Sequence, residues 1–283
     1  MTIETSPAVP GREPVLMMRG ISKNFGAVQA LTDIDLDIYP GEVVALVGDN
    51  GAGKSTLIKI LAGVHPQDTG EIRFHGEPVD IPSPSESREL GIATVFQDLA
   101  LCDNLDVVAN LFLGRELANG LLEEEVMEQR AWELLRQLSA KIPSVRVPIA
   151  ALSGGQRQTV AIARSLIGEP SVVILDEPTA ALGIAQTAEV LNLIERLRER
   201  GHAVVLISHN MADVQAVADR VIVLRLGRNN GNFVNADVSY EDIIAAITGA
   251  TDNPAPTRPN LVADRGSIVS EFPDRGLGKG GRP

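Results

Sequence analysis

The sequence contains a glycine-rich stretch of the pattern G-x-x-x-x-G-K-[ST], which runs from Gly48 to Ser55. Such a loop binds phosphate through successive backbone N–H groups, and the helix that follows adds partial positive charge. Lys54 is expected to reach the β- and γ-phosphates of a nucleotide, and the Ser55 hydroxyl to bind Mg²⁺. The stretch therefore predicts a nucleotide site, with a ligand-free strand-to-helix connection as the alternative. The residues expected to contact the nucleotide are Gly48, Asn50, Gly51, Ala52, Gly53, Lys54, Ser55 and Thr56.

Two adjacent acids, Asp176 and Glu177, follow the apolar run 172–175. A carboxylate at the end of a buried strand can hold Mg²⁺ through water, and a second can deprotonate the attacking water. Because neighbouring residues of an extended chain point to opposite sides, we expect the two acids to divide these roles. Asp176 is then the metal ligand and Glu177 the general base. The alternative is a charged strand end without chemistry.

A second motif, Leu152–Gln156, stands before a predicted helix at residues 157–167. Ser153, Gly154, Gly155 and Gln156 therefore lie at a helix N-terminus, which is again suited to an anion. One nucleotide does not need two such helix starts. We expect the two to act on different nucleotides.

His209 comes two residues after the apolar run 203–207. A side chain at the carboxyl end of a strand lies where open α/β sheets bind their ligands. A lone histidine is more often structural, but its position after the other motifs favours a functional role.

The elements that must position these residues follow from apolar runs and helical periodicity. Such runs predict buried strands at residues 43–47, 92–96, 172–175 and 203–207, with further strands at 34–38 and 70–76. Helices are expected at residues 56–62, 157–167, 186–200 and 240–248. Strands alternating with helices imply a parallel sheet covered by helices on both faces. Residues 98–141 lack strand alternation and carry leucines at helical spacing, which predicts an inserted helical subdomain.

Composition limits the class of protein. The chain has 283 residues, of which 44% are hydrophobic, as in a globular protein with a core. A net charge of −12 argues against a nucleic-acid partner, whose phosphates are bound by clustered Lys and Arg. Cys102 is the single cysteine, so no internal disulfide forms. We find no signal peptide and no run long enough to span a membrane.

Taken in order, the phosphate loop, Gln97, Leu152–Gln156, Asp176-Glu177 and His209 resemble the ATP-binding cassette of ABC transporters. The resemblance covers about residues 15–227. It implies an α/β fold with a P-loop NTPase (RecA-like) parallel-sheet core, an antiparallel β subdomain and a helical subdomain at about 98–165. The nucleotide-binding domain is expected at 15–249, between a flexible N-terminus (1–14) and a Pro- and Gly-rich, disordered tail (250–283).

The resemblance also implies how the motifs act. Two cassettes would form a head-to-tail dimer with two ATPs, each between the phosphate loop of one copy and the Ser153 motif of the other. By position, Phe25 matches the aromatic residue that stacks on adenine. Gln97 matches the residue that senses Mg²⁺ and the membrane subunits, and His209 the switch at the γ-phosphate.

One segment departs from the family pattern. The family usually reads S-A-L-D after the acidic pair, whereas this chain reads Ala180-Ala181-Leu182-Gly183. The glycine removes a carboxylate from the implied interface and is expected to loosen the backbone there. The change bears on coupling between the two sites and on turnover.

Residues 96–101 and 110–116, with this variant segment, look like cassettes of monosaccharide importers of the ribose, fructose and xylose type. This resemblance implies an ATPase, peripheral on the cytoplasmic face of the inner membrane. The implied partners are integral membrane permease subunits, a periplasmic or extracellular sugar-binding protein and a second copy of the chain. The alternatives are a nucleotide-binding module without turnover and a chromosome- or repair-type ATPase. The latter usually inserts a long coiled coil between phosphate loop and Ser153, and no sustained heptads occur here.

Overall fold

A six-stranded sheet forms the core of the protein. The structure is a computed structural model, which describes residues 13–118 and 123–250. Five of its strands are parallel and one edge strand is antiparallel. In spatial order they are β10 (Arg228–Val234), β9 (Arg220–Arg225), β3 (Val43–Val47), β8 (Ala203–Ile207), β7 (Val172–Asp176) and β6 (Ile92–Val95). Most of the predicted tail and most of the predicted flexible N-terminus lie outside the described residues.

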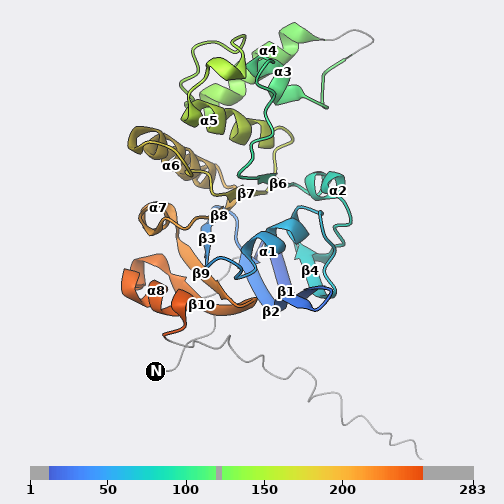
Figure 1. Cartoon of the computed structure of the whole chain (residues 1–283). Coiled ribbons are helices and arrows are strands. Elements are labelled where there is room, and N and C mark those ends of the chain that lie inside the picture. Colours follow the sequence, from blue (N-terminus) through green and yellow to red (C-terminus); the bar gives the residue numbers. More distant parts are fainter. Residues whose placement is uncertain (1–12, 119–122, 251–283) are drawn as a thin grey trace, which may run out of the picture.

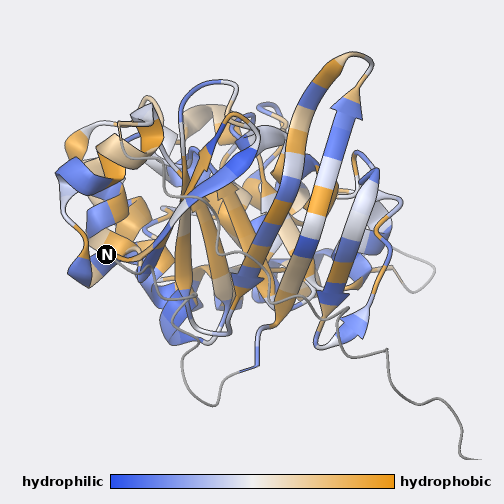
Figure 2. Ribbon diagram, turned by 90° about the horizontal axis from the view of Figure 1, so that it is seen from below, coloured by the Kyte–Doolittle hydropathy of each residue, from blue (hydrophilic) through white to orange (hydrophobic). Residues whose placement is uncertain are grey.

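The parallel strands are apolar throughout because both of their faces are covered. Every residue of β3 is buried, and alternate residues enter two different cores. Val43, Ala45 and Val47 pack in one hydrophobic cluster, while Val44 and Leu46 pack in the other. Figure 2 shows these central strands as a continuous hydrophobic layer.

Helices connect the strands and cover the sheet. α1 (Lys54–Leu61) follows β3, α6 (Ile184–Glu199) joins β7 to β8, and α7 (Met211–Val217) joins β8 to β9. α2 (Pro84–Glu89) precedes β6, and α8 (Tyr240–Thr248) follows β10. Among the described residues, we find no helix with the length and apolar character needed to cross a membrane.

A second, antiparallel sheet has the order β2-β1-β4-β5. Its strands are β1 (Leu16–Phe25), β2 (Val28–Ile38), β4 (Thr69–Phe74) and β5 (Glu77–Pro78). The alternation in the sequence predicted only the buried half of β2, because its first residues are exposed. β1 was missed because shifts in its pairing with β2 interrupt the period of two.

The helical segment between β6 and β7 contains α3 (Val107–Phe112), α4 (Glu124–Gln137), the short 3₁₀ turn η1 (Ile149–Ala151) and α5 (Gly154–Ser165). Figure 1 shows α3, α4 and α5 gathered at one end of the molecule, with the antiparallel sheet at the other. The predicted fold class, a parallel core with an antiparallel β part and an inserted helical part, is confirmed.

Candidate functional site

The glycine-rich loop lies between β3 and α1, as predicted. α1 begins after Gly53, which has a positive φ of 103° and offers no side chain to cap the helix. A Cβ on Gly53 would lie 2.6 Å from Leu31 Cδ2 and 2.9 Å from the carbonyl oxygen of Ala30. Only glycine therefore fits here, and the N–H groups of the first helical turn are left to an external acceptor. A phosphate group suits this cradle.

Lys54 lies across the loop at its first helical position. Its Nζ donates hydrogen bonds to the carbonyl oxygens of Gly48 at 2.6 Å and Asp49 at 3.1 Å. Burial lowers the pKa of the Lys54 ammonium, and the charges of Glu177, Asp49 and Asp176 oppose this shift. The cation and the predicted acidic pair therefore belong to one electrostatic site.

The acidic pair lies where β7 ends beside β8. Asp176 ends the strand, and burial followed by the charge of Glu177 raises the pKa of its carboxyl group, opposed by Lys54. The Glu177 carboxylate is 16% exposed, and its Oε2 lies 2.8 Å from Nδ1 of His209, whose side chain is 77% exposed. The structure thus joins these two predicted residues directly, with His209 at the solvent side.

The expected extended backbone through the acidic pair is wrong at Glu177, where φ is +51°. The N–H of Glu177 donates to the carbonyl oxygen of Ile207, and its carbonyl oxygen accepts from Ala180 N. These bonds turn the chain away from the strand direction. The different surroundings of the two carboxylates therefore do not arise from strand alternation.

Gln97 is placed by strand register. Val95 of β6 pairs with Leu175 of β7, so Gln97, two residues beyond Val95, lies at the same edge of the sheet as Asp176. Its side chain is exposed. β3, β8, β7 and β6 are neighbouring parallel strands, and their carboxyl ends bring the phosphate loop, His209, the acidic pair and Gln97 to one edge.

Phe25, the last residue of β1, lies on the surface with 43% of its area exposed. Its ring packs edge-on against His65, with 5.2 Å between ring centroids, and Lys23 Nζ lies 5.7 Å from the ring centroid. The ring is held in place and keeps an accessible surface, as a stacking residue requires.

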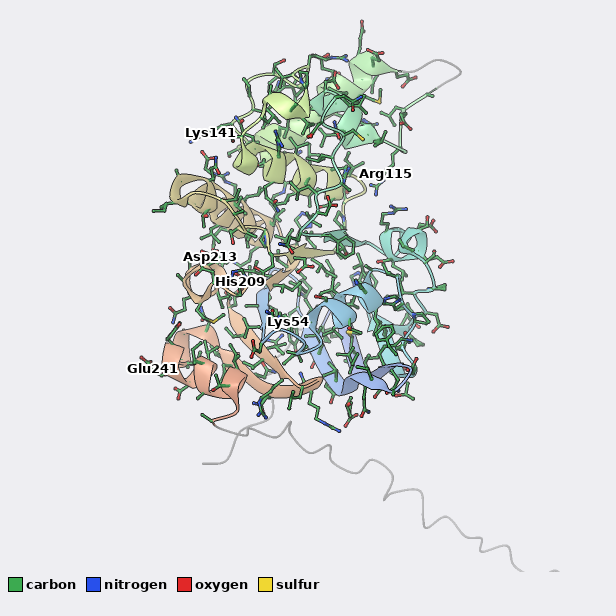
Figure 3. All side chains as sticks on the ribbon, in the orientation of Figure 1. Lys54, Arg115, Lys141, His209, Asp213 and Glu241 are labelled. Atoms are coloured by element: carbon green, nitrogen blue, oxygen red, sulfur yellow. The ribbon has the colours of Figure 1, made fainter. Side chains whose placement is uncertain are left out.

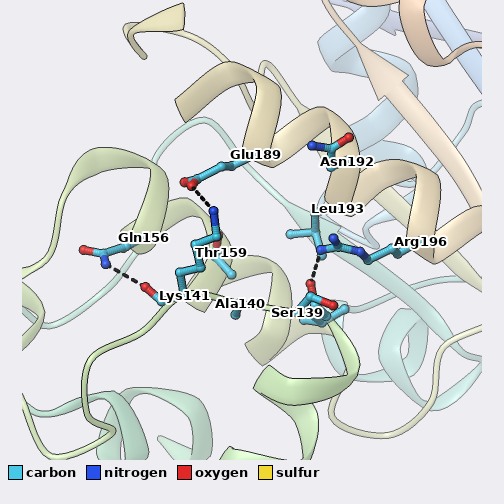
Figure 4. Close-up of a pocket in the computed structure, with 10 residues that line it drawn as sticks. Ser139, Ala140, Lys141, Gln156, Thr159, Glu189, Asn192, Leu193 and Arg196 are labelled. Atoms are coloured by element: carbon cyan, nitrogen blue, oxygen red, sulfur yellow. Dashed lines mark hydrogen bonds and ion pairs between the residues drawn. The ribbon is translucent and has the colours of Figure 1, made fainter. Parts of the chain in front are cut away.

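The predicted second anion motif begins α5. Ser153 Oγ accepts from Gln156 N at 3.3 Å, and Ser153 N donates to Gln156 Oε1 at 2.9 Å, a capping box. The Gln156 amide also donates to the carbonyl oxygen of Lys141 at 2.8 Å, in a pocket beside α6 (Figure 4). Ser153 and Gly154 are exposed.

The two glycines of this motif allow α5 to approach the start of α6. A Cβ on Gly155 would lie 3.0 Å from Gln186 Cβ, and one on Gly154 would lie 3.1 Å from Leu182 Cδ2. In Figure 1, α6 and the strands β6 and β7 lie between α5 and α1. Within one copy, these elements therefore separate α5 from α1.

The residues present suit the cofactors that the motifs imply. The loop offers backbone donors and a cation for a triphosphate, and the Ser55 hydroxyl and Asp176 carboxylate are the hard oxygen ligands that Mg²⁺ prefers. Within residues 13–118 and 123–250, we find no group of three or more His, Cys, Asp and Glu side chains that could hold a metal ion. A magnesium ion here would need phosphate and water oxygens as well.

Sequence reasoning missed two residues near this edge. Thr179 Oγ1 donates to Asp213 Oδ2 at 2.6 Å, which ties the segment after Glu177 to the helix after His209. The signal in the sequence was Asp213 itself, an acid among the apolar residues of α7 that face the protein core.

A phosphate loop beside an acid–histidine pair at one edge of a parallel sheet, with an inserted helical part, is the arrangement of an ATP-binding cassette. Comparison with known proteins agrees. The family model described as ABC transporter matches residues 31–180, and the chain belongs to the ABC transporter family. It is therefore an ATP-binding protein and an ATPase.

Three relatives are informative. A fructose import ATP-binding protein of Rhizobium meliloti is 45% identical over 252 residues, 86% of this chain and 97% of the relative. A xylose/arabinose import ATP-binding protein of Sulfolobus acidocaldarius is 42% identical over 235 residues, 83% of this chain and 94% of the relative. A dimeric ATP-binding cassette in a post-hydrolysis state, bound to ADP and Pi, is 27% identical with a TM-score of 0.67. It aligns with 78% of this chain and 98% of its own.

Proposed function

We propose that this chain is the ATP-hydrolysing subunit of an importer for a monosaccharide. The observation that carries the proposal is the Glu177–His209 pair, 2.8 Å apart, at the sheet edge that also carries Lys54. The relatives from Rhizobium meliloti and Sulfolobus acidocaldarius are import ATP-binding proteins for sugars. A binding module without turnover would not need this pair, and a chromosome- or repair-type ATPase is not favoured by such relatives.

The residues of the phosphate-loop edge divide the chemistry of hydrolysis. Glu177 accepts the proton of the attacking water, and His209 holds the Glu177 carboxylate and contacts the γ-phosphate. Lys54 and the loop N–H groups stabilise the charge that develops on the phosphate oxygens. Mg²⁺, when bound, supplies further positive charge at the phosphates, and Ser55, Asp176 and Gln97 are the residues that hold it.

The remaining motif residues bind nucleotide at two different places. Phe25 stacks on the adenine through its exposed surface. Ser153, Gly154, Gly155 and Gln156 contact the ATP that a second copy holds in its phosphate loop. The separation of α5 from α1 within one copy supports this arrangement, as does the dimeric relative bound to ADP and Pi. A homodimer thus completes two sites that each copy carries only in halves.

The permease subunits bind a groove between α2, β6 and α5. The groove has a volume of about 360 Å³ and an apolar wall that includes Val64, Phe96 and Leu113. Three cations, Arg88, Arg115 and Arg164, also line it, on a chain whose net charge is −12. Burial and then its like-charged neighbour Arg88 lower the pKa of Arg115. A cytoplasmic segment of a permease with apolar and acidic side chains fits such a surface.

The groove also adjoins the segment that follows Gln97. The guanidinium of Arg164 donates to the carbonyl oxygens of Leu99 and Ala100, both at 2.8 Å. A permease segment bound in the groove can therefore act on Gln97 through Arg164, Leu99 and Ala100. A periplasmic or extracellular sugar-binding protein acts on this chain indirectly, through the permease. The chain works at the cytoplasmic face of the membrane as a peripheral subunit.

Reconstitution tests the proposal. The chain is co-purified with its permease, placed in liposomes with the sugar-binding protein, and supplied with ATP and Mg²⁺. Fructose, xylose, arabinose and ribose are tested one at a time, and we expect one of them to stimulate ATP hydrolysis and to accumulate in the liposomes. ATPase activity that no sugar changes would reject sugar import, and no hydrolysis in any preparation would reject the catalytic assignment.

A further inference from the structure

Asp213 is a buried carboxylate that the proposed chemistry does not use. It lies on α7, and the residue is only 5% exposed. Its Oδ2 accepts a hydrogen bond of 2.6 Å from Thr179 Oγ1. Burying a carboxylate is costly, and a neutral pair at this position would hold two elements together at lower cost. Packing alone therefore does not explain a carboxylate at position 213.

The hydrogen bond joins the same two segments as the Glu177–His209 pair. Thr179 lies two residues after Glu177, and Asp213 lies four residues after His209. In the view of Figure 3, His209 and Asp213 are labelled side by side. The two segments are thus connected twice by side chains, at 2.8 Å between Glu177 and His209 and at 2.6 Å between Thr179 and Asp213.

The segment after Glu177 needs such a connection because its backbone is strained. Glu177 and Ala181 have positive φ values of 51° and 60°, although neither is glycine. Conformations of this kind persist only where the surrounding structure holds them. The backbone of the segment is held by turns within itself, Ala180 N to Glu177 O and Leu182 N to Thr179 O. Its side-chain connection to α7 is the Thr179–Asp213 bond.

We propose that Thr179 and Asp213 are positioning residues for hydrolysis. Their hydrogen bond fixes the segment after β7 against α7 and so holds the Glu177 carboxylate at the His209 ring. This inference rests on the proposed roles of Glu177 and His209. It predicts an effect on the chemical step, because the hydrogen bond of Thr179 joins the Glu177 segment to α7 and not to the phosphate loop.

The test compares four single variants, one double variant and Glu177→Gln, each in the full chain assembled with its permease, by kcat, KM for ATP and melting temperature. Thr179→Val keeps the shape but removes the donor, and Thr179→Ser keeps the donor. Asp213→Ala removes the acceptor. Asn230→Ala is the matched control, since it removes a buried side-chain hydrogen bond of 2.6 Å to Ala246 O, between β10 and α8.

We expect Thr179→Val to lower kcat by about tenfold to a hundredfold, as for a small misplacement of a catalytic group, with KM for ATP within about twofold. Thr179→Ser should restore most of kcat. The double variant Thr179→Val/Asp213→Ala should be no slower than Asp213→Ala, because both changes remove the same bond. Asn230→Ala should leave kcat unchanged, whatever its melting temperature.

Three results would overturn the inference. One is a normal kcat in Thr179→Val while Glu177→Gln is inactive, which would leave the proposed function intact. Another is a kcat loss in Asn230→Ala equal to that in Thr179→Val, which would make the effect one of stability. The third is an equal loss in Thr179→Ser. If the wild-type assembly itself does not hydrolyse ATP, the proposed function fails first, and the inference fails with it.

Discussion

Gly183, the residue that departs from the family pattern, is the N-cap of α6, and its geometry makes a quantitative prediction. Its φ and ψ are −75° and 162°, an ordinary extended conformation, and a Cβ built on it meets nothing within 4 Å. The backbone therefore does not require glycine here. The first turn of α6 contains no acidic residue, and the one side-chain contact to the cap is Gln186 Oε1, 3.4 Å from Gly183 N. An aspartate would supply both a cap and a charge.

We expect Gly183→Asp to stabilise the nucleotide-free chain. Replacing glycine by aspartate at an N-cap is worth a few tenths of a kcal/mol, and a negative charge at the helix N-terminus adds about 0.3–1 kcal/mol. The sum, about 0.5–1.5 kcal/mol, corresponds to a rise in melting temperature of roughly 1–5 °C for a domain of this size.

Gly183→Ala is the control for this prediction. It restricts the unfolded chain in the same way as aspartate but supplies no acceptor. Both variants are measured by urea denaturation and by calorimetry without nucleotide. The aspartate variant should be the more stable of the two by about 1 kcal/mol. If the aspartate variant is no more stable than the alanine variant, then the N-cap of α6 does not gain from a side-chain acceptor at position 183, and our reasoning is wrong.

Three further predictions concern the phosphate-loop edge. Glu177→Gln should keep ATP binding but lower kcat by at least about a hundredfold, because the general base is lost, and wild-type turnover would reject Glu177 in that role. Lys54→Ala should cost about 3 kcal/mol of transition-state stabilisation, and an ATPase rate within twofold of wild type would contradict it. Asp176→Asn should raise the melting temperature of the nucleotide-free protein in EDTA at pH 7. Burial and the charge of Glu177 raise the pKa of Asp176 in the fold, so its ionised form destabilises the folded state, and the variant removes that charge. The gain should shrink as the pH falls through the raised pKa of the folded protein, and it should be gone below the ordinary carboxyl pKa of about 3.9. A lower melting temperature of the variant at pH 7 would contradict this reasoning.

The sequence predicted the central strands well because burial on both faces leaves an unbroken apolar run. The predicted strands 43–47 and 203–207 match β3 and β8 residue for residue. β9 and β10 were not predicted, although Val221–Leu224 is apolar, because the Gly/Asn-rich stretch after it resembles a loop. In the structure this stretch pairs with β9, with a shift in register between Asn229 and Gly231. Tertiary pairing overrides local preference in such an edge strand.

The residues of the phosphate-loop edge could be predicted from the sequence because they lie in short motifs. Gly53, Lys54 and Glu177 belong to contiguous motifs whose spacing carries their role. The hydrogen bond between Thr179 and Asp213 joins residues 34 positions apart, and no local sequence pattern predicts such a pair. The close approach of Gly155 to Gln186 was missed in the same way, since the motif itself explained the glycine as part of an anion site.

We expect each ATP to lie between the Lys54 loop of one copy and Ser153 of another. The most direct measurement is a structure of the Glu177→Gln variant with ATP and Mg²⁺, a state that should not turn over. We predict a symmetric dimer in which Ser153 Oγ of one copy lies about 3 Å from a γ-phosphate oxygen held by the other. A monomer with ATP bound at Lys54 and Ser153 exposed to solvent would contradict the account.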